Sequence, residues 1–125
     1  MNRICLILGA LFCALSVILG AFAAHGLKNL LAPSMLAVFK TGVEYQFYHG
    51  LALILFGLAG LFGIKVKWPA IFAILGTVFF SGSLYLLSTT QIAIFGPITP
   101  IGGVCFIICW VLFAIQASKL KARIN

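Results

Sequence analysis

Four apolar stretches, each about as long as a bilayer is thick, constrain this chain more than any other feature. A transmembrane α-helix needs about 20 mostly apolar residues, and such runs cover about residues 4–24, 43–64, 69–88 and 98–118. Soluble domains carry about 25% charged residues, whereas this chain of 125 residues has 7% charged and 64% hydrophobic residues. The sequence therefore predicts one all-α domain, residues 1–125, that forms an integral membrane four-helix bundle in the lipid bilayer.

The cationic residues predict how the bundle is oriented. Short connections make consecutive helices antiparallel neighbours. With the N-terminus inside, the inner loops and ends hold Arg3, Lys65, Lys67, Lys119, Lys121 and Arg123, and the outer loop holds Lys28 and Lys40. The positive-inside rule then favours an antiparallel bundle with both termini cytoplasmic. The net charge of +7 is scattered along the chain, which excludes a clustered nucleic-acid surface.

The end of the first run admits a second interpretation. Arg3 and the small residues Ala21–Ala23 also fit a signal peptide with its cleavage site. The run is long for a signal peptide, and three further apolar runs follow it. We therefore expect the first run to stay in the protein as a span.

A less apolar segment, about residues 30–42, precedes the second run. Pro33 and Ser34 can start a helix there. A helix from Ser34 to Ile64 would be longer than the hydrocarbon core is thick, which is about 30 Å. We expect its first turns to lie in the outer interface, unless the helix bends near Gly50.

Small residues recur at helical spacing in three of the runs. The stripes are Gly9, Cys13, Ser16 and Gly20 in the first run, Gly50, Gly57 and Gly60 in the second, and Gly102, Cys105 and Cys109 in the fourth. Helices associate in lipid through close backbone approach at such residues. The stripes predict packing seams within the bundle, and they could also join a homo-oligomer or a membrane-protein partner.

Polar residues gather in the predicted outer half of every span. The candidate polar site consists of His25, Glu44, Tyr45, Tyr48, His49, Ser81, Ser83, Tyr85 and Thr99. Polar side chains within a membrane are expensive unless they are paired or wet. Their concentration in one leaflet predicts a polar cluster near the outer surface.

Glu44, the only acidic residue, is the most informative member of this cluster. We expect its carboxylate to lie within direct or one-water reach of His25, His49 or Tyr85. Two interpretations stay open: a structural clamp between the first loop and the second helix, or a proton-responsive site built on a carboxylate and an imidazole. Taken singly, His25 also fits an ordinary helix C-cap.

No pattern of an enzyme or of a cofactor site is present. The chain has no Asp, no G-x-S-x-G turn and no phosphate-binding glycine loop. The four cysteines, Cys5, Cys13, Cys105 and Cys109, lie inside apolar runs and are interpreted as small packing residues. His25, His49 and Glu44 are three conceivable metal ligands without a distinctive spacing. We expect no catalytic residue, cofactor or metal.

Four motifs, in order, resemble one protein family. They are "GAFAAHGLK" after the first run, "VEYQFYHGLAL" in the second, "SGSLYLL" in the third and "GPITPIGGVCFIICWVLFA" in the fourth. The chain resembles the domain of unknown function 423 family, which includes transmembrane protein 256 of animals. The resemblance implies a small four-span protein of the bacterial cell membrane, and it implies no reaction, substrate or cofactor.

Two functions are compatible with these features. The first is a structural or partner-binding membrane protein without enzymatic activity. The alternative is a minimal proton-linked transporter, or a protein that binds a small ligand, using Glu44 with His25 or His49.

Overall fold

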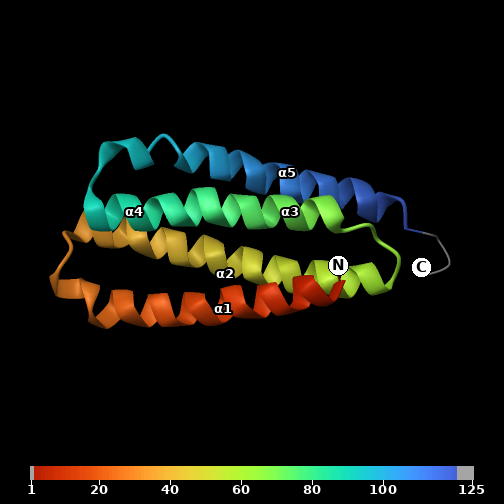
Figure 1. Cartoon of the computed structure of the whole chain (residues 1–125), viewed down its shortest axis with the longest axis horizontal. Helices are drawn as coiled ribbons and strands as arrows, with labels where there is room; N and C mark the ends of the chain where they lie inside the picture. The colour runs from red at the N-terminus through yellow and green to blue at the C-terminus, as the bar shows by residue number, and fades with distance from the viewer. Residues whose placement is uncertain (1, 121–125) are drawn as a thin grey trace.

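Four helical rods follow one another up and down the molecule (Figure 1). The structure is a computed structural model that describes residues 2–120. Three rods are single α-helices: α1 (Asn2–His25), α2 (Pro33–Leu61) and α5 (Thr99–Ser118). The third rod is composite, because α3 (Lys67–Gly76), a π-helical turn η2 (Thr77–Ser81) and α4 (Gly82–Thr90) run end to end. The predicted all-helical class is confirmed.

The connections between the rods are short, and local chemistry explains where they fall. The 3-10 turn η1 (Leu27–Asn29) joins α1 to α2, which begins at Pro33 in the first helical turn, where a proline is tolerated. Gly63 has a φ of 94°, so the chain can leave α2 in a left-handed conformation that glycine adopts without strain. A second 3-10 turn, η3 (Ala93–Phe95), precedes α5.

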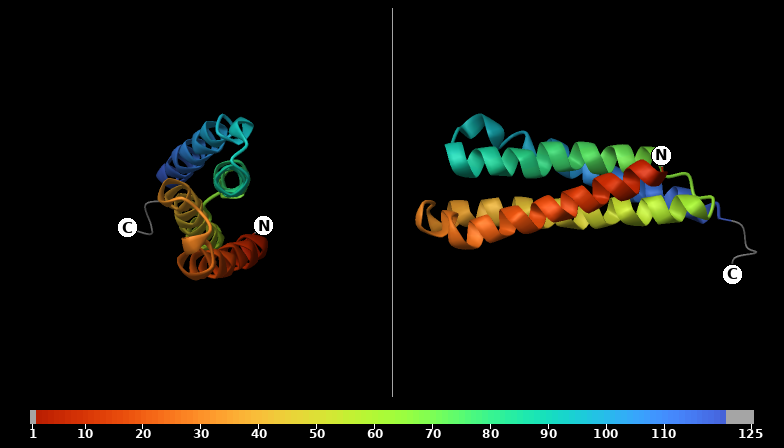
Figure 2. Two further views of the ribbon diagram at one scale, coloured as in Figure 1. Left: turned by 90° about the vertical axis from the view of Figure 1, so that its left-hand side faces the viewer. Right: turned by 60° about the horizontal axis from the view of Figure 1, so that its bottom comes forward.

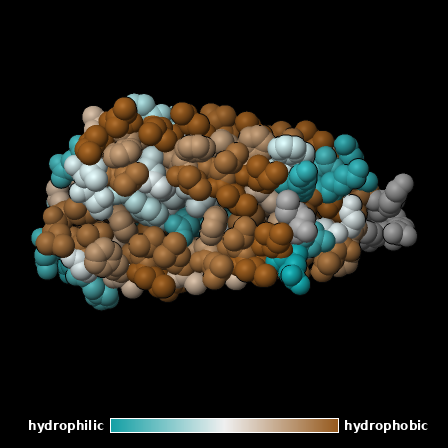
Figure 3. Space-filling view, viewed as in Figure 1, coloured by the Kyte–Doolittle hydropathy of each residue, from teal (hydrophilic) through white to brown (hydrophobic). Residues whose placement is uncertain are grey.

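Three rods are long and apolar enough to cross a bilayer: Asn2–His25, Lys67–Thr90 and Ala93–Ser118. Helix α2 has the length, with 29 residues, but Lys40, Glu44, Gln46 and His49 make its first half polar. Hydrophobic side chains cover most of the flank of the molecule, and hydrophilic ones gather toward its two ends (Figure 3). This distribution is the one expected of a protein embedded in lipid.

Helix α2 is continuous from Pro33 to Leu61, close to the helix from Ser34 to Ile64 that the sequence suggested. The expected interfacial segment is therefore largely the first part of α2, and no break occurs at Gly50. Twenty-nine residues span about 44 Å at about 1.5 Å per residue. The helix thus exceeds the hydrocarbon thickness of about 30 Å without bending.

The rods pack in chain order. Helix α1 lies against α2, α2 lies against the third rod, and the third rod lies against α5 (Figures 1 and 2). An apolar core in the half where α1 begins draws buried residues from all four rods, including Cys5, Phe56, Ala70 and Cys109. Because α1 and α5 are the outer members of this series, both leave wide apolar faces exposed.

The small-residue stripes form seams inside the chain, as predicted. A Cβ atom on Gly9 would lie 2.6 Å from the Gly50 carbonyl oxygen, and one on Gly50 would lie 2.8 Å from the Cys13 sulfur. Such distances are shorter than real Cβ contacts, so α1 and α2 meet here by backbone approach. On α5, a Cβ on Gly102 would overlap the backbone of Phe80 in the π-helical turn.

Candidate functional site

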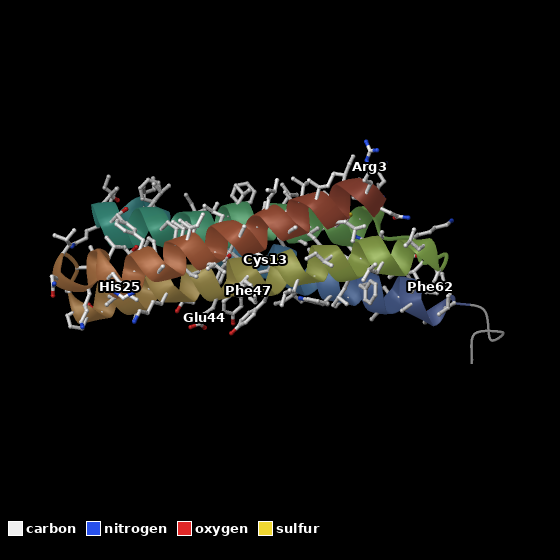
Figure 4. The ribbon with its side chains drawn as sticks, turned by 90° about the horizontal axis from the view of Figure 1, so that it is seen from below. Arg3, Cys13, His25, Glu44, Phe47 and Phe62 are labelled. Carbon is white, nitrogen blue, oxygen red and sulfur yellow. The ribbon has the colours of Figure 1, made fainter. Side chains whose placement is uncertain are left out.

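The predicted polar residues of α2 are divided between two faces of the helix. Gln46 and His49 are each 4% exposed and point into the bundle. Glu44 and Tyr48 are exposed on the surface of the bundle, and Figure 4 shows Glu44 pointing away from the helices. At about 100° per residue, Glu44 and His49 lie about 140° apart around the helix.

Gln46 joins three helices through both ends of its side-chain amide. Its Nε2 donates to the carbonyl oxygen of Phe12 on α1 at 3.0 Å. The hydroxyl of Tyr85 on α4 donates to its Oε1 at 2.7 Å. The Tyr85 ring reaches this point over Gly42, where a Cβ would lie 2.8 Å from a ring carbon. Gln46 was not predicted as a site residue, yet it is the central clamp of the half of the bundle in which α1 ends.

His49 joins α2 to α5 through its Nε2 nitrogen, while its Nδ1 nitrogen bonds within α2. Trp110 Nε1 lies 3.0 Å from His49 Nε2 and can only donate, so that nitrogen accepts. His49 Nδ1 must then carry the proton, which it donates to the Tyr45 carbonyl oxygen at 2.8 Å. The imidazole also stacks on Phe106, with ring centroids 3.5 Å apart. Both nitrogens are therefore engaged in the neutral ring, and Trp110 is a partner that the sequence did not reveal.

A third polar contact joins α4 to the first turn of α5. The Ser83 and Thr99 hydroxyl oxygens lie 2.6 Å apart, and Ser83 also donates to the Phe80 carbonyl oxygen at 2.9 Å. Ser81 is completely buried, and its hydroxyl is the one buried side-chain polar atom without a hydrogen-bond partner within residues 2–120. Ser83 and Thr99 therefore lie at one contact between the third rod and α5.

The predicted contact between Glu44 and His25, His49 or Tyr85 is wrong. Glu44 forms no hydrogen bond or ion pair within the described residues 2–120, while His49 and Tyr85 bond to other groups. His25 is exposed at the end of α1, apart from Glu44 (Figure 4). These residues face different directions around their helices.

Glu44 lies instead over a shallow crevice on the outside of α1 and α2. This cavity of about 220 Å³ includes Ser16, Val17 and Tyr48. Side chains of a helix lean toward its N-terminus, and the N-terminal end of α2 is the end with η1. The carboxylate therefore leans toward the end of the molecule that holds η1, and away from the middle of the apolar flank.

Metal ligands do not converge in the described part of the chain. No group of three or more His, Cys, Asp and Glu side chains within residues 2–120 could hold a metal ion. The conceivable ligand set does not form one site, because His25, His49 and Glu44 are not grouped together. The four cysteines are free, and Cys5 and Cys109 are buried in the apolar core.

An open groove between α2 and α5 passes beside His49. Its outer part, here called the aromatic groove, is a cavity of about 350 Å³ lined by Tyr45, His49, Phe80, Gly103, Phe106, Ile107 and Trp110. Past Trp110 it meets an apolar cavity of about 450 Å³ that includes Leu55, Phe113 and Leu120. The groove exists because α2 and α5 both pack on the third rod and not closely on each other.

These features define a multi-pass membrane protein, with at least three spanning rods and a polar network that links them. The chain belongs to the family described as "Protein of unknown function (DUF423)", whose model matches residues 19–103. This result confirms the resemblance and the expected place in a bacterial cell membrane.

Relatives extend the match to nearly the whole chain. A UPF0382 membrane protein of Staphylococcus haemolyticus is 48% identical over 118 residues, which is 94% of this chain and 97% of the relative. The UPF0382 membrane protein YwdK of Bacillus subtilis is 45% identical over 122 residues, 94% of this chain and 98% of the relative. No solved structure matches the chain significantly.

Proposed function

We propose that the chain crosses the membrane four times, with both ends in the cytoplasm. Helix α2 lies between α1 and the third rod, both of which can span a bilayer, so α2 would cross beside them. The end of the bundle at which α1 begins carries Arg3, Lys65, Lys67 and Lys119, and the other end carries Lys28 and Lys40. The excess of cations supports a cytoplasmic location for the first end. Lys121 and Arg123, which belong to the same prediction, lie outside the described residues.

We further propose that this protein has no catalytic role and binds the transmembrane helix of a partner, either a second copy or another membrane protein. The aromatic groove is the single observation that carries the proposal. It is open on the flank between α2 and α5, and aromatic rings form its walls around Gly103. Helices associate in lipid by close backbone approach at small residues. Because Gly103 has no side chain, it offers such a position in the groove wall, where the backbone of a partner helix can approach closely.

The small-residue stripes do not provide this surface, because they are occupied within the chain. Gly9 and Gly50 meet each other, and Gly102 meets the π-helical turn. A partner helix therefore needs a different surface. The aromatic groove supplies one that no helix of the chain fills in the part described, residues 2–120.

Proton-linked transport through Glu44 gains no support from the contacts. A proton path needs groups that exchange partners, but both nitrogens of His49 are engaged with Tyr45 and Trp110. Glu44 faces away from them. The polar network is better explained as a set of clamps between helices.

Photo-crosslinking tests the partner proposal. A photoreactive residue in place of Ile107, 65% exposed on the groove wall, is compared with one in place of Ile18, 63% exposed on α1. We expect a discrete protein adduct from position 107 alone, and its mass distinguishes a second copy from another protein. Adducts with lipid only, or the same protein adducts from both positions, would contradict the proposal.

A further inference from the structure

The end of the bundle at which α3 begins holds a basic cavity. A hollow of about 520 Å³ between α3 and α5 is lined by polar residues that include Lys65, Lys67 and Gln116. A neighbouring hollow of about 300 Å³ shares Lys65 and Gln116 and adds Lys119. Each hollow is lined by two lysines, and Lys65 and Gln116 belong to both. We call the two adjoining hollows together the basic cavity, which thus carries three lysines from two segments of the chain.

The positive charge of the basic cavity has no acidic side chain to balance it. Glu44 is the only acidic side chain in the sequence, and it lies in the opposite half of α2, on the outside of α1 and α2. None of the three lysines forms an ion pair with a side chain in the stretch from residue 2 to residue 120. A ligand that complements this recess is therefore an anion.

The inner walls of the same hollow are apolar. Phe72 on α3 and Leu112 on α5 line it about one helical turn deeper in the rods than Lys67 and Gln116. At the mouth, the Lys67 amino group lies 5.6 Å from the centre of the Trp68 ring, a cation–π contact that holds the charge at the rim. Cations at the rim and hydrocarbon below it match a molecule with an anionic head and an apolar tail.

We propose that the basic cavity binds an anionic phospholipid. Lys65, Lys67 and Lys119 hold the phosphodiester of the headgroup, and Gln116 donates a further hydrogen bond from its amide. One acyl chain lies along Phe72 and Leu112 toward the middle of the membrane. Basic pockets between membrane helices bind anionic headgroups in this way. The apolar wall selects a lipid over a free phosphate, because a soluble anion would leave that wall uncovered.

Native mass spectrometry of the full chain in detergent tests this site. Phosphatidylglycerol and phosphatidylcholine with identical acyl chains are added at equal concentration, and the bound lipid is counted. We expect the wild type to retain phosphatidylglycerol in preference to phosphatidylcholine. The pair Lys65→Gln/Lys67→Gln should lower the affinity for phosphatidylglycerol about tenfold to thirtyfold, since each lysine near a membrane surface contributes roughly fivefold.

The pair Lys28→Gln/Lys40→Gln is the matched control, because it removes the same charge from the other end of the bundle. It should change the affinity for phosphatidylglycerol less than twofold. Equal losses in the two pairs, or no preference for phosphatidylglycerol in the wild type, would overturn the site. Displacement of the lipid by millimolar inorganic phosphate would show that the ligand is a soluble anion and would overturn the lipid assignment. All of these exposed lysines can be replaced without disturbing the core, which circular dichroism of each variant verifies.

Discussion

The hydrogen bond between Trp110 and His49 is the contact whose removal tests the polar network most directly. Replacing Trp110 by Phe deletes the N–H that lies 3.0 Å from His49 Nε2. The second bond of the imidazole, from Nδ1 to the Tyr45 carbonyl oxygen, stays in place. The change thus isolates one interhelical bond between α2 and α5.

The magnitude follows from the burial of His49. An interhelical hydrogen bond in a membrane contributes about 0.6 kcal/mol on average and up to about 1.7 kcal/mol. His49 is 4% exposed, so its Nε2 would keep no partner, which adds to the loss. Part of the Trp110 ring contact with Phe56 is retained by phenylalanine. We therefore expect Trp110→Phe to lower the free energy of unfolding by about 1–2 kcal/mol.

The assay is reversible unfolding in mixed micelles with increasing denaturing detergent, followed by circular dichroism. Trp68→Phe is the matched control, because Trp68 is the other tryptophan, is 57% exposed and lies at the far end of the third rod. It should leave the unfolding free energy almost unchanged. A double-mutant cycle with His49→Phe should return a coupling energy of about 1 kcal/mol.

Two results would refute this reasoning. If Trp110→Phe and Trp68→Phe destabilise the protein equally, the indole N–H has no special partner. If the coupling between Trp110 and His49 is zero within error, the two side chains do not share a bond. Either outcome would remove the main contact that joins α2 to α5 beside the aromatic groove.

Further predictions concern the clamps, the seams and the topology. Gln46→Leu removes bonds to two helices and should lower the unfolding free energy by about 1–3 kcal/mol in the same assay. Gly102→Ala should prevent α5 from docking on the π-helical turn and yield aggregated protein on gel filtration, whereas Gly82→Ala, which meets nothing within 4 Å, should elute as the wild type does. Glu44→Gln should leave the unfolding curve unchanged, because the carboxylate has no bond within residues 2–120 to lose; a clear shift would reveal a partner for it. Reporter tags fused to the two chain ends should both be detected only in the cytoplasm, and detection on opposite sides would exclude four spans.

The bounds of the first, third and fourth rods could be predicted from the sequence to within about two residues, whereas α2 begins at Pro33, before its apolar run. Apolar runs of bilayer length predicted all four, and α5 begins one residue after the expected start. Glycine spacing predicted the seam between Gly9 and Gly50, because close approach needs small residues at helical intervals. The π-helical turn Thr77–Ser81 was not predicted, since one extra residue in a turn leaves the apolar run unchanged.

The hydrogen-bond partners of the polar residues could not be predicted from their positions along the chain. Position along a helix follows from residue number, whereas the direction of a side chain depends on which face packs. That face was available in the sequence: Gly42, Gln46, His49 and Leu53 recur at helical spacing, and all four are buried. Glu44 falls outside this stripe. This stripe includes His49 and excludes Glu44, so it indicates that the imidazole and the carboxylate face different sides of α2.

The two halves of the molecule differ in how many rods their apolar packing joins. In the half where α1 ends, the buried cluster of Ala23, Leu27 and Phe39 has no member from α5, and the polar residues lie in that half. The half in which α1 begins has an apolar core to which all four rods contribute, including Phe56 and Cys109. In the other half, Gln46 joins α1, α2 and α4, His49 joins α2 and α5, and Ser83 joins α4 to the start of α5. Lipid gives apolar helices no hydrophobic reason to associate, so directional bonds can fix the rods where the core does not reach. Substitutions should therefore destabilise the first half mainly through lost volume, and the second half through lost hydrogen bonds as well as through lost volume around Phe39.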